Sequence, residues 1–342
     1  MKDLKYLFAY TGSIAAFLGL YLGGWWSFGI TYIAFGIIPL LEQFIPQSID
    51  NHPVEKEEAR SHHPIFDALL YVHIPVLYAI LFYAFYKIAN TELTTLESVG
   101  MIFNVGIIVG SYGINVGHEL GHRQNKFEQF LSKILLLPAL YQHFFIEHNR
   151  GHHKNVATDL DPATSRLGEN LYSFWFRSVK DSYLNAWRLE SERLEKEGKP
   201  VMSFENEMLR FQFYQIAYLV SVKFFFGTPA LFFAIAFAIG GFLLLETVNY
   251  IEHYGLRRQI LPNGRYEPVL PHHSWNSDHE LGRIFLYELT RHSDHHYKTT
   301  RKFQILRHFD ESPQLPFGYP LSMIVSLVPP LWFKMMDKRV PS

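Results

Sequence analysis

Residues 98–122 read SVGMIFNVGIIVGSYGINVGHELGH, an apolar run that ends in two histidines four positions apart. The part before the histidines, 98–117, holds no charged residue and has the length of about 17 to 25 residues that a helix needs to cross a bilayer. On a helix, positions four apart share a face, so His118 and His122 can bind one ion. The stretch therefore predicts a transmembrane helix that leads directly into a metal site.

Five further apolar segments predict five more transmembrane helices. They cover residues 6–24, 27–46, 65–86, 211–226 and 228–250. With 98–117 they form three hairpins, whose links are 24–26, 88–96 and 227–229. A cleaved signal peptide is the alternative for the first segment, but that segment is longer than a signal peptide's apolar region and leads straight into the second. We expect an all-α integral membrane protein with six transmembrane helices.

The basic residues indicate how these helices are oriented. An even number of spans places both termini on one side of the membrane, and an excess of Lys and Arg marks the cytoplasmic side. Of the 31 lysines and arginines, only Lys87 and Lys223 lie outside the two tails and the loops that follow the second and fourth predicted helices. We therefore expect both termini on the cytoplasmic side.

Long polar segments separate the apolar ones. Helices one to four occupy 1–118, a polar segment 119–210, helices five and six 211–250, and a second polar segment 251–342. We expect the two polar segments, 119–210 and 251–342, to lie on the cytoplasmic side and to form one cap that carries the metal site.

Two stretches of the cap have helical patterns. Residues 127–145 are apolar but contain Pro138, which predicts a helix lying at the membrane interface, with a seventh span as the alternative. Residues 181–199 alternate charges at helical spacing and predict a solvated surface helix.

Composition limits the chemistry. The chain has no cysteine, which excludes disulfides, thiolate zinc sites, iron-sulfur clusters and thiolate-ligated haem. The 18 histidines crowd into a few short segments. The net charge of −1 indicates no particular partner. We expect no nucleic-acid partner, and any metal has to bind to ligands other than cysteine.

Four short segments carry half of the 18 histidines. They are HELGH at 118–122, HNRGHH at 148–153, EHYG at 252–255 and HSDHH at 292–296. Helical spacing puts His148 with His152 on one ion, and it puts His292, His295 and His296 on one face. All four segments lie on the cap side of the membrane. Nine imidazoles exceed what one ion can use, so we expect two metal ions.

The carboxylates next to these histidines have a predicted role as well. Glu119, Glu147, Glu252 and Asp294 are expected to accept hydrogen bonds from the ligand imidazoles and so to hold each ring in one tautomer. HELGH also fits a zinc metalloprotease with Glu119 as general base, but such a site needs one more ligand rather than seven more histidines.

A membrane metal transporter is an alternative from a different class. Transporters usually hold ionisable ligands near the middle of the bilayer, whereas only His73 lies well inside a predicted span. For the histidines outside the four segments we favour a structural role; they include His62, His63, His143, His272, His273, His279 and His308.

At the four segments the chain resembles the bacterial membrane-bound alkane 1-monooxygenases, within the superfamily of histidine-box membrane hydroxylases and desaturases. The resemblance is carried by HELGHR at 118–123, EHNRGHH at 147–153, NYIEHYGL at 249–256 and RHSDHH at 291–296. Weaker support comes from DPATSRLGE at 161–169, PHHSWNS at 271–277 and MDKRV at 336–340. Thr290 and Tyr297 depart from the residues common in the family, and neither is an expected ligand.

The resemblance implies a non-haem di-iron enzyme of the bacterial inner membrane that uses O2 to hydroxylate n-alkanes from the lipid phase to 1-alcohols. The implied iron ligands are His118, His122, His148, His152, His153, His253, His292, His295 and His296. A related hydroxylase or desaturase that acts on aromatic methyl groups or fatty-acyl chains is the alternative within the superfamily.

Electrons have to come from a separate protein, because the chain has no flavin or nicotinamide motif and no cysteine. The resemblance implies rubredoxin, supplied by rubredoxin reductase. An acidic carrier would meet basic residues near the histidines; the candidates are Arg123, Arg150, Arg257, Arg258, Arg291, Arg301 and Arg307.

Overall fold

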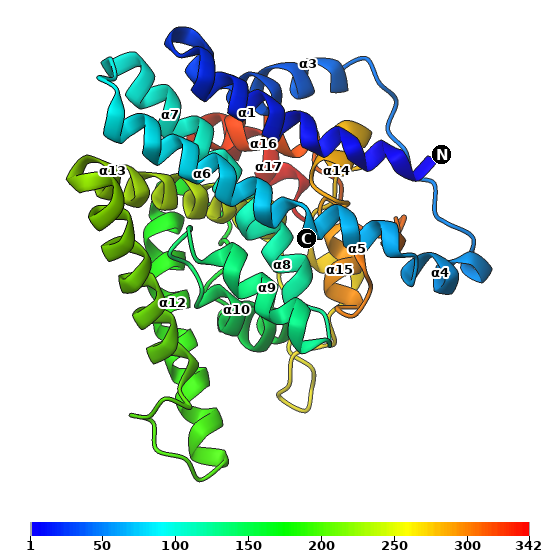
Figure 1. Cartoon of the computed structure of the whole chain (residues 1–342). Coiled ribbons are helices and arrows are strands. Elements are labelled where there is room, and N and C mark those ends of the chain that lie inside the picture. Colours follow the sequence, from blue (N-terminus) through cyan, green and yellow to red (C-terminus); the bar gives the residue numbers. More distant parts are fainter. Residues whose placement is uncertain (1, 342) are drawn as a thin grey trace.

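The computed structural model describes residues 2–341, and nearly all its regular structure is helical (Figure 1). Among these residues the β pairs are two isolated bridges, Ile260 with Tyr266 and Asn276 with Gln314. The prediction of an all-α protein is confirmed. Four helices are long and apolar enough to cross a membrane: Gly24–Glu42, Pro64–Asn90, Thr95–Gly121 and Glu207–His253.

The first two predicted spans form a helical hairpin. A 3-10 stretch, η1 (Lys2–Ala9), runs into α1 (Tyr10–Leu22). Gly23 and Gly24 follow with φ of 70° and 53°, a conformation that favours glycine and ends the helix. The returning span consists of η2 (Gly24–Phe28), α2 (Gly29–Tyr32), the π-helix η3 (Ile33–Ile37) and α3 (Ile38–Glu42).

The next two spans follow a short cap helix, α4 (Val54–Ser61). The third span is made of α5 (Pro64–Tyr71) and α6 (His73–Asn90). The fourth begins at Thr94, whose side chain forms a capping box with Glu97. It comprises α7 (Thr95–Ile108), the π-helix η4 (Val109–Ile114) and α8 (Asn115–Gly121). In Figure 1, α1, α6 and α7 lie side by side.

The fifth and sixth predicted spans lie within α13 (Glu207–His253). Gly227 has non-helical angles inside this element, with φ 87° and ψ 176°. Pro229 follows, and it cannot donate the backbone hydrogen bond that would continue the preceding turn. The segment therefore consists of two helices that meet at Gly227, as the sequence predicted.

The cap is built from short helices and one long one. Its elements are α9 (Lys126–Leu136), α10 (Phe144–Glu147), the π-helix η5 (His148–His152), α11 (His153–Asn155), α12 (Leu171–Lys196), η6 (Pro271–His273), α14 (Glu280–Phe285), α15 (His292–Tyr297), η7 (Phe303–Ile305), α16 (Tyr319–Ser326), α17 (Pro329–Met336) and η8 (Asp337–Arg339). α9 ends before Pro138 and is too short to be a seventh span. α12 packs against α13. In its charged second half, Glu190 accepts from Arg150 on η5 and from the backbone N–H of Glu207 at the start of α13.

Buried Asn104 on α7 ties the first hairpin to the fourth span. Its side-chain amide donates to the carbonyl oxygen of Ala16 at 2.9 Å, and its Oδ1 accepts from the backbone N–H of Ile30 at 3.0 Å. Polar side chains of this kind hold transmembrane helices together, because lipid offers them no other partner.

The hairpin also depends on a close approach of α2 to α1 at Gly29. A Cβ atom on Gly29 would overlap the backbone carbonyl oxygen of Ala15, whereas a Cβ on Gly36 would have no atom within 4 Å. We expect Gly29→Ala to destabilise the protein by about 1–3 kcal/mol and Gly36→Ala to leave stability unchanged. Thermal unfolding of the two variants in detergent measures this, and equal melting temperatures would contradict the packing.

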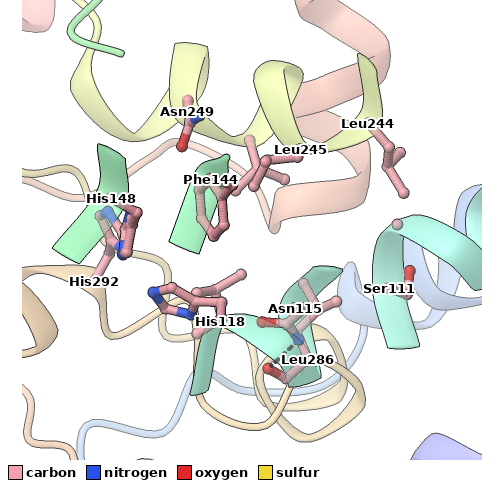
Figure 2. Close-up of a pocket in the computed structure, with 13 residues that line it drawn as sticks. Ser111, Asn115, His118, Phe144, His148, Leu244, Leu245, Asn249, Leu286 and His292 are labelled. Atoms are coloured by element: carbon pink, nitrogen blue, oxygen red, sulfur yellow. Dashed lines mark hydrogen bonds between the residues drawn. The ribbon is translucent and has the colours of Figure 1, made fainter. Parts of the chain in front are cut away.

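Two apolar cavities lie between the spans and the cap. The smaller, of about 40 Å³, is lined by Gly110, Ser111, Asn115, His118, Phe144, His148, Leu244, Leu245, Val248, Asn249, Leu286, Leu289 and His292 (Figure 2). The larger, of about 570 Å³, lies between α7, α13 and α16. Leu244 lines both, so the two cavities are neighbours.

Candidate metal centre

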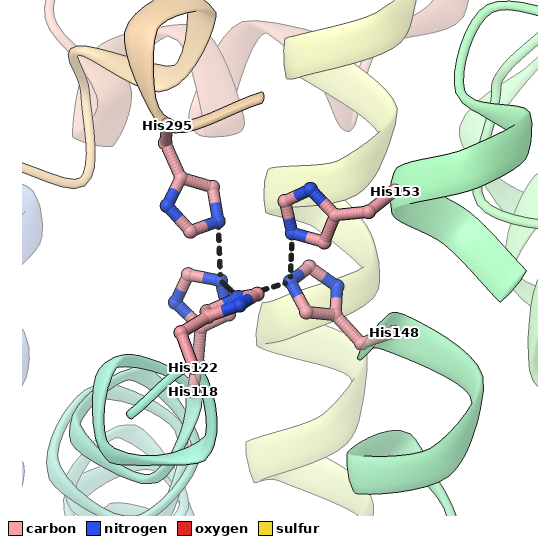
Figure 3. Close-up of side chains that lie close together, drawn as sticks. All are labelled: His118, His122, His148, His153 and His295. Atoms are coloured by element: carbon pink, nitrogen blue, oxygen red, sulfur yellow. Dashed lines mark hydrogen bonds between the residues drawn. The ribbon is translucent and has the colours of Figure 1, made fainter. Parts of the chain in front are cut away.

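The structure brings all nine predicted ligands together in two groups. One group holds His118, His122, His148, His153 and His295, and the other holds His152, His253, His292 and His296. Within each group the candidate ligand atoms all lie within 4.8 Å of one another. Figure 3 shows the five rings of the first group, from α8, η5, α11 and α15, turned toward a common space.

The imidazoles of each group face one another through Nε2. In the first group the Nε2 atom of His118 lies 2.9 Å from that of His295 and 3.1 Å from that of His122. In the second group the Nε2 atom of His292 lies 2.9 Å from that of His296 and 3.2 Å from that of His253.

The two groups are adjacent. The rings of His153 and His296, one from each group, have centroids 4.4 Å apart. Residues from four separate segments of the chain thus form one histidine cluster at the cap ends of α8 and α13.

The second histidine segment differs from its prediction. We expected His148 and His152 to share an ion, but His152 belongs to the other group. The reason is that η5 is a π-helix, in which the N–H of His153 bonds to the carbonyl oxygen of His148. Five residues then complete a turn, so His148 and His153 share a face and His152 points away from it.

The fourth segment, 292–296, is divided in the same way. His292 and His296, four apart on α15, lie in one group, but His295 lies in the other. The three rings lie close together on α15, with centroids 4.4–5.6 Å apart, as the spacing predicted, but they do not all belong to one group. α15 instead lies between the two groups and contributes ligands to both, because the consecutive residues His295 and His296 point to different groups.

Burial keeps most of these imidazoles neutral. It lowers the pKa of His122 to about 3, with smaller contributions from His152 and Arg123. Burial also lowers the pKa values of His148, His153 and His295 well below their usual range. A neutral imidazole has one nitrogen lone pair free to bind a metal.

His152 is the exception, and the cause is a carboxylate that the sequence did not single out. Its Nδ1 lies 2.9 Å from the Oδ2 atom of buried Asp161. Burial alone would lower the pKa of His152, but the charge and hydrogen bond of Asp161 outweigh it and raise that pKa. Asp161 thereby holds the proton on Nδ1 and leaves the Nε2 lone pair directed at the cluster. Its place in the quoted DPATSRLGE segment was the available signal.

The four carboxylates expected in this role are placed differently. Glu119 bonds to Arg123 at 2.8 Å, Asp294 bonds to Arg301 at 2.6 Å, and Glu147 accepts from Asn185 at 3.0 Å. Among the described residues none of these three bonds to an imidazole, so the prediction is wrong for them. The oxygens of these three carboxylates instead accept from arginine and amide donors, and these bonds hold the cap helices together.

Glu252 does meet a histidine, but on the metal-facing side. Its Oε2 lies 3.1 Å from the Nε2 atom of His292, and its other oxygen has no hydrogen-bond partner among the described residues. The carboxylate therefore faces the second group rather than the outer edge of a ring, where it was expected.

The donor set fits two metal ions. Adjacent Nε2 atoms at 2.9–3.2 Å can share at most one proton per contact. The Nδ1 atoms of His153, His253, His292 and His296 have no partner among residues 2–341. Neutral imidazoles whose lone pairs converge suit Fe, Zn, Cu or Ni. One cation in each group would accept the converging Nε2 lone pairs of that group.

The arginines predicted for partner docking are mostly engaged within the chain. Arg123 and Arg291 are only 6% and 2% exposed, so neither is available to a protein partner, and the prediction is wrong for these two. Arg301 and Arg307 pair with Asp294 and Glu57. The remaining three also have partners within the chain, but each is at least partly exposed. Arg150 pairs with Glu190, Arg257 pairs with Asp159, and Arg258 donates to the backbone carbonyl oxygen of Glu267.

Histidines outside the cluster have structural partners. His73 stacks on Tyr10 and on Tyr112, each with ring centroids 4.5 Å apart, and its Nε2 lies 2.6 Å from the Tyr287 hydroxyl. His273 accepts the N–H of Leu270 through Nδ1, so its Nε2 carries the proton and donates to Glu267. The contacts of His73 agree with a structural role. His273 also forms, with Glu267 and His272, a third group of possible metal ligands, so its structural role stays a prediction.

Taken together, four apolar spans and a buried cluster of nine histidines define a membrane-embedded metal-binding protein of the histidine-box class. The sequence model of the fatty acid desaturase family matches residues 98–324. Alkane 1-monooxygenase 1 of Alcanivorax borkumensis is 39% identical over 94% of this chain and 81% of its own length. Alkane 1-monooxygenase 2 of Pseudomonas aeruginosa is 40% identical over 96% and 90%.

The chain belongs to the alkane 1-monooxygenase family. A more distant relative is the xylene/toluene monooxygenase hydroxylase component of Pseudomonas putida, which is 27% identical over 99% of this chain and 89% of its own length. The suspected resemblance is confirmed.

Proposed function

We propose that the protein is an alkane 1-monooxygenase that hydroxylates the terminal carbon of n-alkanes. The observation that carries this proposal is the convergence of nine histidines beside an apolar cavity, in a chain about 40% identical to alkane 1-monooxygenases.

The two histidine groups would each hold one iron ion, five imidazoles on one and four on the other. When bound, the irons would supply the activation of O2 for insertion into a C–H bond. Asp161 keeps His152 in the tautomer that can bind metal. Glu252 stands close enough to the second group to act as a further ligand. The buried cap and its aliphatic lining exclude bulk water from the reacting carbon.

The two cavities give the alkane a route from the lipid to the metal. The larger is lined by Thr31, Phe35, Ile102, Phe103, Gly106, Ile107, Trp175, Ala236, Ile239, Gly240, Leu243, Leu244, Thr247, Met323, Ile324 and Leu327. Such a lining offers an n-alkane apolar contact and nothing to hydrogen-bond. Leu244 stands where this cavity meets the one lined by His118, so a chain lying lengthwise presents its methyl end to the cluster.

The far end of the larger cavity should limit alkane length. Ala236 lies eight residues before Leu244 on α13, about 12 Å along a helix. We expect Ala236→Phe to shorten the space and to lower the ratio of hexadecane to octane turnover by roughly tenfold, the order that a lost apolar contact produces.

Ala79→Phe is the matched control, because Ala79 is exposed on α6 and lines neither cavity. Competition of the two alkanes, with both alcohols quantified, measures the ratio. An unchanged ratio in Ala236→Phe would remove this cavity from the substrate route.

We also propose six transmembrane crossings, with both termini and the cap on the cytoplasmic side of a bacterial inner membrane. Support comes from the continuous helix over residues 2–22 and from the break at Gly227. The division into helices over 1–118 and 211–250 and cap segments over 119–210 and 251–342 rests on the same features and on the distribution of Lys and Arg.

Rubredoxin, reduced by its reductase, is the proposed electron donor. A chain without cysteine needs a separate carrier, and the partly exposed Arg150, Arg257 and Arg258 are the arginines we propose for contact with an acidic one. Exposed surface charges raise association rate more than affinity, so the rate of reduction by rubredoxin should fall with added salt.

Whole cells that express the chain with rubredoxin and its reductase test the proposal. They are fed octane, dodecane, hexadecane and xylene, and the products are identified by mass spectrometry. A 1-alcohol from an alkane is the expected result. Products from xylene alone would instead favour an aromatic-methyl hydroxylase, and no product from a metal-loaded protein would refute both functions.

A further inference from the structure

Trp175 and Thr247 form a polar pair in the larger cavity that the roles assigned above leave unused. Among the described residues that line this cavity, only Thr31, Trp175 and Thr247 have a side-chain oxygen or nitrogen. The indole N–H of Trp175, on α12, donates to the hydroxyl oxygen of Thr247, on α13, at 3.1 Å. The Thr247 hydroxyl in turn donates to the backbone carbonyl oxygen of Leu243 at 2.7 Å. Because both donors of the pair are bonded, the pair presents no free donor to an alkane.

The pair lies at the metal end of the larger cavity. Thr247 follows Leu244 by three residues, about 4.5 Å along the helix, and Leu244 lines both cavities. Thr31 lies about two turns further from the metal, because its neighbour on α2 bonds to α7 where α7 packs against Gly240, seven residues before Thr247. A molecule that leaves the metal centre past Leu244 therefore meets Trp175 and Thr247 first.

The product of terminal hydroxylation needs such partners, whereas the substrate does not. An alkane has no polar atom, but a 1-alcohol has one O–H donor and two acceptor sites on its oxygen. Moving this hydroxyl into an apolar cavity without a hydrogen bond is costly. The Thr247 oxygen keeps one acceptor site after it has accepted from Trp175, and the indole N–H can be shared with a second oxygen beside it.

We propose that Trp175 and Thr247 bind the hydroxyl group of the 1-alcohol as it leaves the metal centre. The alcohol O–H donates to the Thr247 oxygen, and the Trp175 N–H donates to the alcohol oxygen. No covalent bond changes in this step. The alkyl chain of the product stays in the larger cavity, so the alcohol competes with the next alkane for the same space.

The position of Trp175 suits a stage between the cavity and the exterior. Its side chain is only partly buried. The preceding turn of α12 is tied to the far wall by Tyr172, whose hydroxyl donates to the backbone carbonyl oxygen of Leu327 at 2.7 Å. Leu327 lines the cavity and is 43% exposed, so this wall borders the surface. A hydroxyl bound to Trp175 is therefore at the edge of the cavity, where an indole combines an apolar ring with a polar N–H.

The inference rests on the proposed function, and Thr247→Val and Trp175→Phe test it. Valine keeps the shape of threonine without its hydroxyl, and phenylalanine keeps an aromatic ring without the N–H. Thr31→Val is the matched control, because Thr31 lines the same cavity at its other end. The four iron-loaded proteins are compared in one detergent with rubredoxin and its reductase. Iron per chain, KM for dodecane and the inhibition constant of added 1-dodecanol are measured.

We expect the inhibition constant of 1-dodecanol to rise roughly 3- to 10-fold in Thr247→Val and in Trp175→Phe, the factor that one hydrogen bond contributes. Iron content and KM should stay at the wild-type values, and Thr31→Val should match the wild type throughout. An unchanged inhibition constant in either variant, an equal rise in Thr31→Val, or a KM that rises by the same factor would overturn the inference while dodecane turnover by the wild type upholds the proposed function. If the wild type made no 1-dodecanol, the proposed function would fail and this inference with it.

Discussion

We expect the His148→Ala variant to lose alkane hydroxylation on the order of a thousandfold, and its iron content to drop from the proposed two to about one per chain. A metal ion contributes several kcal/mol to such a reaction, and each 1.4 kcal/mol changes the rate tenfold. His148 has Nε2 contacts to both His122 and His153, at 3.1 and 2.9 Å. Its loss therefore opens the five-histidine group and leaves the other group complete.

His279→Ala is the control for that variant. His279 is also buried, but its Nδ1 bonds to the Ser277 hydroxyl at 3.0 Å, outside both groups. Metal analysis by mass spectrometry and product formation from dodecane should be unchanged in it. Two irons and full activity in His148→Ala would remove His148 from the ligand set.

We expect the Asp161→Asn variant to bind iron about 10- to 100-fold more weakly, the range found when a partner of a metal-bound histidine is replaced. Asparagine keeps the size of the side chain but loses the charge that raises the pKa of His152. Ring orientation in the four-histidine group then becomes less defined. Retention of iron during dialysis against a graded series of chelator concentrations measures the affinity.

Asp159→Asn provides the comparison, two residues earlier in the chain. The Asp159 side chain is 71% exposed and pairs with Arg257 on the surface. It should release iron at the wild-type chelator concentration. If Asp161→Asn does the same, the hydrogen bond to His152 does not support the metal site.

The four long apolar helices were predictable because their determinants are local. Lipid demands long runs without charge, and the run from 98 to 117 can be recognised without knowing what surrounds it. The convergence of the nine histidines followed from placing every histidine segment on one face of the membrane. The break at Gly227 was visible as a Gly-Thr-Pro sequence between two apolar runs.

The division of the histidines between the groups was not predictable from spacing. An α-helical reading pairs His148 with His152, but η5 adopts a π-helix and pairs His148 with His153 instead. A π-turn has no reliable sequence signature.

The partners of the charged groups depended on tertiary contacts. Arg123 lies next to a histidine segment, yet Glu119 binds it in the interior. Asp161 is nine residues from His152, and only the turn between them brings the carboxylate to Nδ1.

The measurement that tests the central claim most directly uses purified protein loaded with iron. It is reduced chemically, mixed with dodecane and exposed to ¹⁸O₂, and the product is analysed by mass spectrometry. The account predicts 1-dodecanol that carries ¹⁸O, formed by protein containing two irons per chain. Protein with two irons that yields no labelled 1-dodecanol would contradict it.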